Sequence, residues 1–501
     1  MANPSATQLL FGERRTILTA SASISRPAIS RQQARTWLLL ALILLIQGGL
    51  TSLDATPRYC FGDSGSYLWS AYHGGPVDRS WTYPAWFLRP ILSLRSLNLI
   101  VYVQCALGVV PAWLAFGLVS RRDGRRSDMV AFVTACAVLI EPLALTYQRF
   151  ILADSLGLVM AAAALFLCVR VIDRSARAPI YAALAPPFMV LAASLRTSQV
   201  PSLALLCLFM LILLFFFYRD YRSGATLLVS LVLCQLVFSH YAIKNQGTPG
   251  YNAASGRFML AAVLPIVSRD DVQPYIDPVR MPAILDDDAR NRRARPNELF
   301  NPGLVADEIQ QATESVKKES ELARRIAVHA MLRDPISFFR LAWSSYLDYF
   351  DESFIQGRVL LEAGNGEFNQ DELSHFAEHH IYDVVNTNLV QSPVRGYFEA
   401  AWRYYGLIPA ISAILLAASL VVDRRLSTLT LAAFALASAA SHIAFSTEPV
   451  PRYLIVSAWV NIVVAGRIVC VLATRRSPSG VTRPVNQTTT RSSEQRANAL
   501  A

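Results

Sequence analysis

The fold is decided by a nearly unbroken apolar run, Leu152-Ala-Asp-Ser-Leu-Gly-Leu-Val-Met-Ala-Ala-Ala-Ala-Leu-Phe-Leu-Cys-Val-Arg170. About 20 predominantly apolar residues cross the hydrocarbon core of a bilayer as one α-helix. Lipid offers no partner for backbone N–H and C=O groups, so a run of this kind is predicted to be helical. Similar runs recur along the chain, in which 53% of the 501 residues are hydrophobic and only 16% are charged. The composition therefore predicts an all-α polytopic membrane protein.

The apolar runs divide the chain into two membrane modules. About ten spans are expected, with nine to eleven as the range. An N-terminal module, residues 37–243, holds about seven of them, and a C-terminal module, residues 402–473, holds about three. The polar ends, residues 1–36 and 474–501, are expected to be disordered cytoplasmic tails. The expected spans are residues 37–53, 98–119, 128–146, 152–170, 180–195, 201–218, 225–243, 402–422, 427–446 and 452–472.

Arginine sets the expected orientation. The formal net charge is +10, and lysine is so rare that arginine carries nearly all of the positive charge. The arginines cluster at span ends on one side, which the positive-inside rule assigns to the cytoplasm. Both termini are therefore expected in the cytoplasm, and charge scattered over span ends argues against a nucleic-acid-binding stripe. The clusters are Arg121, Arg122, Arg125 and Arg126; Arg170, Arg174 and Arg177; Arg219 and Arg222; Arg424 and Arg425; Arg475 and Arg476.

The same topology places two long segments on the outer face. The first outer loop, residues 54–97, is rich in tryptophan and tyrosine, which favours short helices at the headgroup level. The segment 244–401, between the seventh and eighth spans, is the largest extramembrane region. Within it, residues 336–350 fit either an interfacial helix or a short eleventh span. The interfacial helix is favoured, because a span would bury Arg340 and Asp348 in hydrocarbon.

Ionisable side chains gather at the outer ends of the spans, where a charge at membrane depth usually pairs or serves a function. Asp63 lies in Cys60-Phe-Gly-Asp-Ser-Gly-Ser-Tyr-Leu-Trp-Ser-Ala71, just after the first span. A plain structural interpretation exists for each: Asp63 as a turn or N-cap residue, Arg149 as a snorkelling cation, and Arg196 as a cation at a helix end. The remaining members are Tyr67, Asp154, Tyr453, and Glu448 with Arg452, which are four residues apart and can pair.

Several of these residues stand in short motifs. Asp63 has a Gly-Asp-Ser-x-x-Tyr setting, a Pro-x-x-x-x-Tyr pattern leads to Asp154 in the fourth span, and Arg196 ends the fifth span. A Glu-x-x-x-Arg-Tyr pattern precedes the last span. As a set, the motifs resemble the GT-C superfamily, the polytopic glycosyltransferases that use polyprenyl-phosphate sugars and include protein O-mannosyltransferases and the lipid A aminoarabinose transferase. The resemblance covers mainly residues 37–260 and 402–472.

The resemblance implies an inverting sugar transfer with Asp63 as the base for an acceptor hydroxyl. It implies that Arg149, Arg196 and Arg452 bind phosphate, since a guanidinium presents a flat fork to phosphate oxygens. Asp154 would bind a metal or position the acceptor. The other substrate-binding candidates are Tyr67, Glu448 and Tyr453.

The resemblance also implies a place and a set of partners. The donor would be a polyprenyl-phosphate-linked sugar, the acceptor a cell-envelope glycan, lipid or protein, and the site the outer face of a bacterial cytoplasmic membrane. The family often carries two adjacent acids in the first loop, whereas Asp63 is followed by Ser64, so the second acidic role is unfilled or falls to Asp154. No cofactor is expected, and a divalent cation is left open because some relatives use one.

Other functions stay open at this point. A transporter or flippase for a lipid-linked or anionic substrate is one alternative, although the chain shows no internal repeat of the kind that many transporters have. A ligase or polymerase of surface polysaccharide is another. His375 and His379 are four residues apart, on one helix face with Glu378 near them, as in some zinc sites. No further ligand type stands nearby, so no metal site is predicted there.

Overall fold

The computed structural model of the chain describes residues 31–60, 63–75, 79–120, 125–275, 292–296, 305–313, 315–363, 368, 370–384 and 391–475. Regular structure over these residues is helical. The pairing outside helices is an isolated parallel bridge between Arg58 and Phe150. The prediction of an all-α polytopic membrane protein is confirmed in this coarse form. The two expected tails lie almost wholly outside the described residues.

Nine helical stretches of the described chain are long and apolar enough to cross a membrane. They agree with nine of the ten expected windows to within a few residues. The stretches are Ala34–Leu53, Asn98–Val119, Asp154–Ile172, Ala178–Leu195, Thr197–Phe217, Tyr221–Gln246, Trp402–Val421, Leu426–Phe445 and Pro451–Thr474. They correspond to α1 (Arg31–Leu53), α4 (Asn98–Leu107) with α5 (Val109–Val119), α8 (Asp154–Ile172), α9 (Ala178–Leu195), η2 (Thr197–Gln199) with α10 (Val200–Ile212) and η3 (Leu213–Phe217), α11 (Tyr221–Gln246), α21 (Trp402–Val421), α22 (Leu426–Phe445), and η9 (Pro451–Leu454) with α23 (Ile455–Arg475).

The expected span 128–146 is not one continuous helix. The structure has α6 (Arg125–Ile140) followed by the short α7 (Pro142–Tyr147). Glu141 between them has an extended backbone, and its side chain accepts the N–H of Ala144 as the N-cap of α7. The break occurs here because proline disfavours helical backbone in the residue before it and is well suited to the first turn of a new helix.

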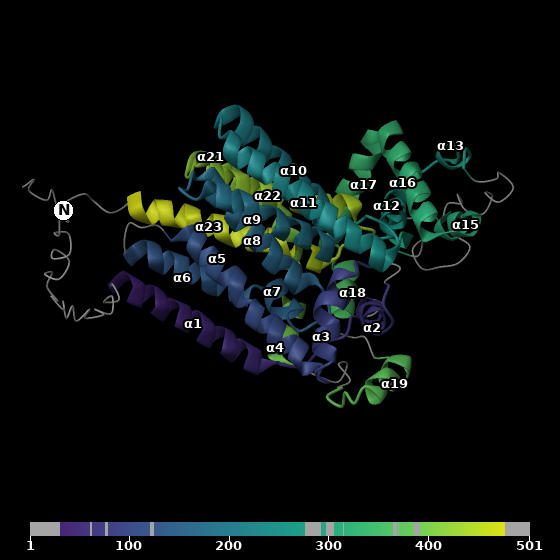
Figure 1. Cartoon of the computed structure of the whole chain (residues 1–501), viewed down its shortest axis with the longest axis horizontal. Helices are drawn as coiled ribbons and strands as arrows, with labels where there is room; N and C mark the ends of the chain where they lie inside the picture. The colour runs from purple at the N-terminus through teal and green to yellow at the C-terminus, as the bar shows by residue number, and fades with distance from the viewer. Residues whose placement is uncertain are drawn as a thin grey trace, which may run out of the picture. The chain divides into compact units, whose positions relative to one another are not determined.

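The long helices pack side by side (Figure 1). α8 lies against α9, and α9 lies against α11. α6 lies against both α5 and α23, and α21, α22 and α23 all contact one another. Gly466 of α23 sits directly against the side chain of Thr134 of α6, so no side chain fits there. Alanines at buried positions in α8 and α9 likewise let the two backbones approach closely.

The loop 54–97 contains short helices, as expected: α2 (Asp63–His73), η1 (Pro84–Leu88) and α3 (Arg89–Leu92). Its aromatic residues divide into two groups. Trp69 and Trp86 are exposed, whereas Trp81 and Tyr83 are buried, and Trp81 stacks on Phe238 of α11. Part of the aromatic signal in this loop therefore reflects packing against the helix bundle.

The segment 244–401 folds into helices with a core of their own. Leu260, Val305 and Ile326 are among the buried residues of this core. Residues 336–350 form α17 (Pro335–Leu347) and η7 (Asp348–Phe350), which pack on α22 and α21 and do not meet the length of a span. The other helices of the segment are α12 (Ser255–Val263), η4 (Leu264–Ile266), α13 (Arg269–Val272), η6 (Arg292–Ala294), α15 (Val305–Ala312), α16 (Val316–Arg333), α18 (Glu352–Glu362), α19 (Gln370–Glu378) and α20 (Pro393–Ala400).

Candidate functional site

Asp63 is the first residue of α2 and lies between two arginines. Its carboxylate forms ion pairs with Arg79 and with Arg452, whose Nη2 lies 2.5 Å from Oδ2 of Asp63. The preceding turn is closed by the Ser64 hydroxyl, which accepts the backbone N–H of Cys60. Burial by itself raises the pKa of Asp63, but the charges of Arg452 and Arg79 outweigh burial and hold that pKa well below its usual range. Asp63 is therefore an ionised carboxylate that does more than close a turn.

Arg452 connects the last membrane helix to the segment 244–401. It lies in η9, at the start of α23, and is buried. Besides Asp63, it pairs with Glu362 of α18, whose Oε1 is 3.5 Å from Nε of Arg452. The guanidinium carbon lies 5.4 Å from the centroid of the Tyr453 ring, a cation–π distance. Sequence reasoning placed Arg452 and Tyr453 correctly at a span end, and the structure adds Glu362 as their neighbour.

Asp154 and Arg196 meet across the α8–α9 hairpin. Asp154 is the first residue of α8 and Arg196 follows the last residue of α9, so the antiparallel pair brings them together as an ion pair. Gly157 makes room for this approach, since a Cβ at that position would lie 3.1 Å from Cγ of Arg196. Arg196 also lies over the Tyr453 ring, 5.3 Å from its centroid, and its charge helps to lower the pKa of Asp63. The Asp154–Arg196 pair and the Asp63–Arg452 pair therefore belong to one site.

A further acid, Glu362, enters the site from α18. Its Oε2 accepts a 2.6 Å hydrogen bond from the Tyr147 hydroxyl, and its Oε1 is 3.2 Å from the guanidinium of Arg358. Arg358 also pairs with Glu448 at 2.8 Å. The alternative of a Glu448–Arg452 pair within one turn is wrong, because each residue has taken a different partner. The only sequence signal for Glu362 is its i, i+4 spacing from Arg358, a common surface pattern.

We call the paired acidic and basic side chains of this site the ion-pair cluster. It contains as many carboxylates as guanidinium groups, and each arginine touches at least one acid. Such an arrangement can exchange a carboxylate of the chain for an anionic ligand without burying an unpaired cation. Its members are Asp63, Asp154, Glu362 and Glu448 with Arg79, Arg196, Arg358 and Arg452.

Arg149 lies outside the ion-pair cluster. It is fully buried, which excludes the snorkelling interpretation. Its guanidinium donates to the backbone carbonyls of Asp54 at 2.7 Å and Leu50 at 2.6 Å, and to that of Leu145. These bonds tie the end of α1 to α7. All the partners that the structure gives this guanidinium are backbone carbonyls, so its role there is structural.

Tyr67 lies one turn after Asp63 on α2 and is buried. Its ring packs edge-on against that of Tyr83, with centroids 5.0 Å apart. Burial raises the pKa of its hydroxyl, and Asp63 adds to the effect while Arg196 opposes it. Tyr67 therefore borders the cluster as a neutral packing residue.

Catalysis by a cysteine nucleophile and binding of a metal ion are both poorly supported by the described residues of this site. Burial raises the pKa of Cys60 to about 11, although Arg452 opposes the change, so this thiol is not a ready nucleophile. In the described part of the chain, no group of three or more His, Cys, Asp or Glu side chains is arranged to hold a metal ion. His375 instead lies 3.3 Å from Glu378 and stacks on the Tyr72 ring.

Comparison of the chain with protein-family models, with curated proteins and with solved structures finds no match. The chemistry of the ion-pair cluster therefore has to be inferred from its geometry. The cluster contains an ionised carboxylate, Asp63, beside two guanidinium groups that share one aromatic ring.

Proposed function

We propose that the chain is a membrane glycosyltransferase that moves a sugar from a polyprenyl-phosphate donor to a hydroxyl of a cell-envelope acceptor. The observation that supports this most is the placing of Asp63 between guanidinium groups at one end of the helix bundle. Sugar transfer needs a carboxylate for the acceptor proton and cations for the departing phosphate, and Arg196 and Arg452 lie on the same Tyr453 ring beside Asp63. A donor with a lipid tail also explains why the site is built on membrane helices.

The proposed reaction is a single inverting displacement. The acceptor oxygen forms a bond to the anomeric carbon while the bond from that carbon to the phosphate oxygen breaks. The proton of the acceptor hydroxyl passes to Asp63, and the lipid phosphate leaves with the bonding electrons, facing Arg196 and Arg452. Because those arginines now pair with acids of the chain, donor binding has to replace a carboxylate at one of them. A phosphate placed there raises the pKa of Asp63 by adding negative charge, which makes Asp63 a stronger base when the donor is present.

Glu362 is the candidate for the second acidic role that the first loop leaves unfilled. Its contact with Arg452 places it next to the arginine that pairs with Asp63. Asp154, by contrast, faces Arg196, which favours orienting that arginine over binding a metal. No metal or other cofactor is part of this proposal.

The proposed topology has ten crossings, with α6 as the third. The start of α8, where Asp154 lies, is at the end of the bundle that carries the ion-pair cluster. The start of α4 lies at the same end, because Asp383 of the segment 244–401 caps it by accepting the N–H groups of Leu97 and Asn98. The chain leaves that end along α4 and α5 and begins α8 there again, so α6 has to return it. Its 16 residues measure roughly 24 Å at about 1.5 Å per residue, and α7 adds to that length.

With ten crossings and the positive-inside rule, both termini would lie in the cytoplasm and the ion-pair cluster on the outer face of the bacterial cytoplasmic membrane. The acceptor would then approach from the segment 244–401, which contributes Arg358 and Glu362 to the site. Trp343 and its exposed apolar neighbours on α17, Ile336 and Phe339, would lie at the headgroup level.

The test is Asp63→Asn, with Asp270→Asn, at an exposed position of α13, as the matched control. Membranes containing each variant receive synthetic polyprenyl-phosphate hexoses and pentoses, and release of polyprenyl phosphate is measured. Asp63→Asn is expected to lower turnover by about 10²–10⁴-fold, the range for removal of a general base, with normal membrane abundance. Retained turnover would remove Asp63 from the base role.

A transporter or flippase for a lipid-linked or anionic substrate is the second candidate. The pairing of every cluster arginine with a carboxylate favours it, because such networks can open and close as a gate. Release of polyprenyl phosphate in the same assay, together with a transport measurement, separates the two functions. A transferase consumes the donor, whereas a transporter moves intact donor across reconstituted vesicles. Polysaccharide ligation would be identified by transfer of a whole glycan from a lipid-linked oligosaccharide.

A further inference from the structure

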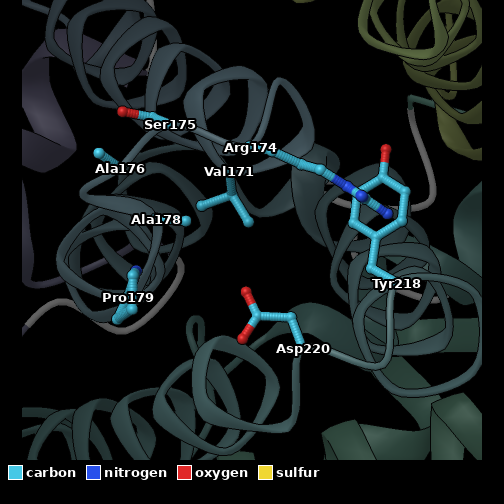
Figure 2. Close-up of a pocket in the computed structure, with 8 residues that line it drawn as sticks. All are labelled: Val171, Arg174, Ser175, Ala176, Ala178, Pro179, Tyr218 and Asp220. Atoms are coloured by element: carbon cyan, nitrogen blue, oxygen red, sulfur yellow. The ribbon is translucent and has the colours of Figure 1, made fainter. Parts of the chain in front are cut away.

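A second candidate binding site lies at the opposite end of the bundle from the ion-pair cluster. An open cavity of about 340 Å³ lies between the α8–α9 connection and the connection that leads into α11. Its size falls within the range of about 300–1,000 Å³ that is typical of small-molecule sites. The lining residues, drawn in Figure 2, are Val171, Arg174, Ser175, Ala176, Ala178, Pro179, Tyr218 and Asp220.

Arg174 provides the positive charge of this cavity. Its guanidinium carbon lies 3.9 Å from the centroid of the Tyr218 ring, and Figure 2 shows the side chain extended across that ring. Its backbone has φ of 52°, the left-handed region where glycine is usual after a helix. Within the described residues, Arg174 forms no ion pair, so the charge is oriented by an aromatic face without being neutralised.

Asp220 provides a negative charge on the facing wall. It is the N-cap of α11, where Oδ1 accepts the N–H of Ser223 at 3.1 Å. Figure 2 shows its carboxylate directed into the open space between the two connections. The two walls are joined by a 3.1 Å hydrogen bond from the Tyr218 hydroxyl to the carbonyl of Ile172. The cavity therefore carries a positive and a negative charge on two walls that a hydrogen bond holds together.

The position of the cavity identifies its environment. Four membrane-spanning stretches end around it: α8 at Ile172, α9 at Ala178, the η3 helix at Phe217, and α11 at Tyr221. The aromatic side chains of Phe217 and Tyr221 are exposed beside it, as expected where helices pass through the headgroup zone. A ligand of this cavity would lie at the depth of phospholipid headgroups.

We propose that this cavity binds the headgroup of a phospholipid that carries a primary ammonium group. The phosphate lies against the guanidinium of Arg174, which presents several donors in a planar fork. The ammonium group lies against Asp220, whose carboxylate accepts hydrogen bonds from it. The acyl chains run along the exposed faces of the neighbouring helices. This site is separate from the ion-pair cluster and does not depend on the proposed sugar transfer.

The experiment measures lipid retention by the full chain in native mass spectrometry after reconstitution with equal amounts of phosphatidylethanolamine, phosphatidylglycerol and phosphatidylcholine. The wild type is expected to retain phosphatidylethanolamine preferentially. Arg174→Gln is expected to lower its retention about fivefold, the effect of one basic residue near a lipid phosphate. Asp220→Asn is expected to remove the preference among the three lipids. The control Arg222→Gln makes the same charge change at the same end, outside the cavity lining, and retains the wild-type pattern.

Three results would overturn the proposal. One is a wild type without preference for phosphatidylethanolamine, and another is an Arg222→Gln effect as large as that of Arg174→Gln. The third is displacement of the lipid by soluble phosphoethanolamine at equal concentration, which would assign the site to a water-soluble ligand. A loss of preference in Asp220→Asn with unchanged melting temperature supports it.

Discussion

Arg452 is the residue at which distant parts of the chain converge. It contacts Asp63 from the first loop and Glu362 from the segment 244–401, and it shares the Tyr453 ring with Arg196 from the end of α9. Breaking a buried pair of this kind costs about 3–5 kcal/mol when one partner is removed, because the other charge is left uncompensated. A double change that removes both partners of one pair keeps the charge balanced and is expected to cost less stability than a single change.

At the residue scale, Arg196 tests phosphate binding. Arg196→Gln combined with Asp154→Asn removes both charges of one ion pair, so the fold is expected to persist. Affinity for a polyprenyl-phosphate analogue is expected to fall about tenfold or more, since a hydrogen bond to a charged group contributes about 1.5–3 kcal/mol. Binding is measured by ligand-dependent fluorescence quenching in detergent. Unchanged affinity, with Arg222→Gln as the control, would contradict the phosphate role of Arg196.

The lowered pKa of Asp63 makes a prediction about acid stability. Since the pKa is lower in the folded chain than in the unfolded one, where it is about 3.9, Asp63 contributes stability above that value. The contribution disappears as the pH falls through the folded pKa. The melting temperature of Asp63→Asn is therefore expected to lie below that of the wild type at pH 7, and the gap to narrow as the pH falls below about 4. A gap that stays constant down to pH 3 would contradict the ion-paired state of Asp63.

At the element scale, the segment 244–401 contains a close helix crossing. α12 meets α16 at Gly256, where a Cβ would lie 1.8 Å from the backbone oxygen of Ser320. Gly256 also donates its N–H to the Ser320 hydroxyl at 2.9 Å. The backbone of α16 cannot move aside without disturbing the buried core that α12, α15 and α16 share.

Gly256→Ala is therefore expected to destabilise the segment 244–401 by about 1–3 kcal/mol, the usual cost of overpacking. Limited proteolysis with sites mapped by mass spectrometry measures the effect. Gly357→Ala in α18 is the matched control, because a Cβ there meets no atom within 4 Å. That change is expected to be neutral or stabilising by up to about 1 kcal/mol. Equal protection of the two variants would show that the crossing is not tight.

At the scale of the whole molecule, the number of crossings decides which face carries each site. If α6 crosses, fusions after Arg122 and after Arg476 lie on one side of the membrane, and a fusion near Asp286 lies on the other. Paired alkaline phosphatase and fluorescent-protein reporters at these positions measure the side directly. Arg122 and Asp286 reporting the same side would contradict the ten-span topology, and with it the outer-face location of the ion-pair cluster.

The amino-acid sequence by itself determined the helices and the polar residues at their ends. Long apolar runs are a local property, so nine spans could be predicted closely, and Asp63, Asp154, Arg196 and Arg452 could be selected because charges at membrane depth are costly. The same locality explains the error at Pro142, where the hydropathy continues but the helix does not.

The tertiary structure alone decided which charges meet. Arg149 and Arg196 look alike in sequence, yet one is enclosed by backbone carbonyls and the other joins the ion-pair cluster. Glu362 and Arg358 come from a polar segment that carries no hydropathy signal, and they reach the site only because that segment folds back onto the bundle. The Asp63–Arg452 pair joins the first loop to the last helix of the chain, so its partners are set by the packing of helices rather than by any local pattern.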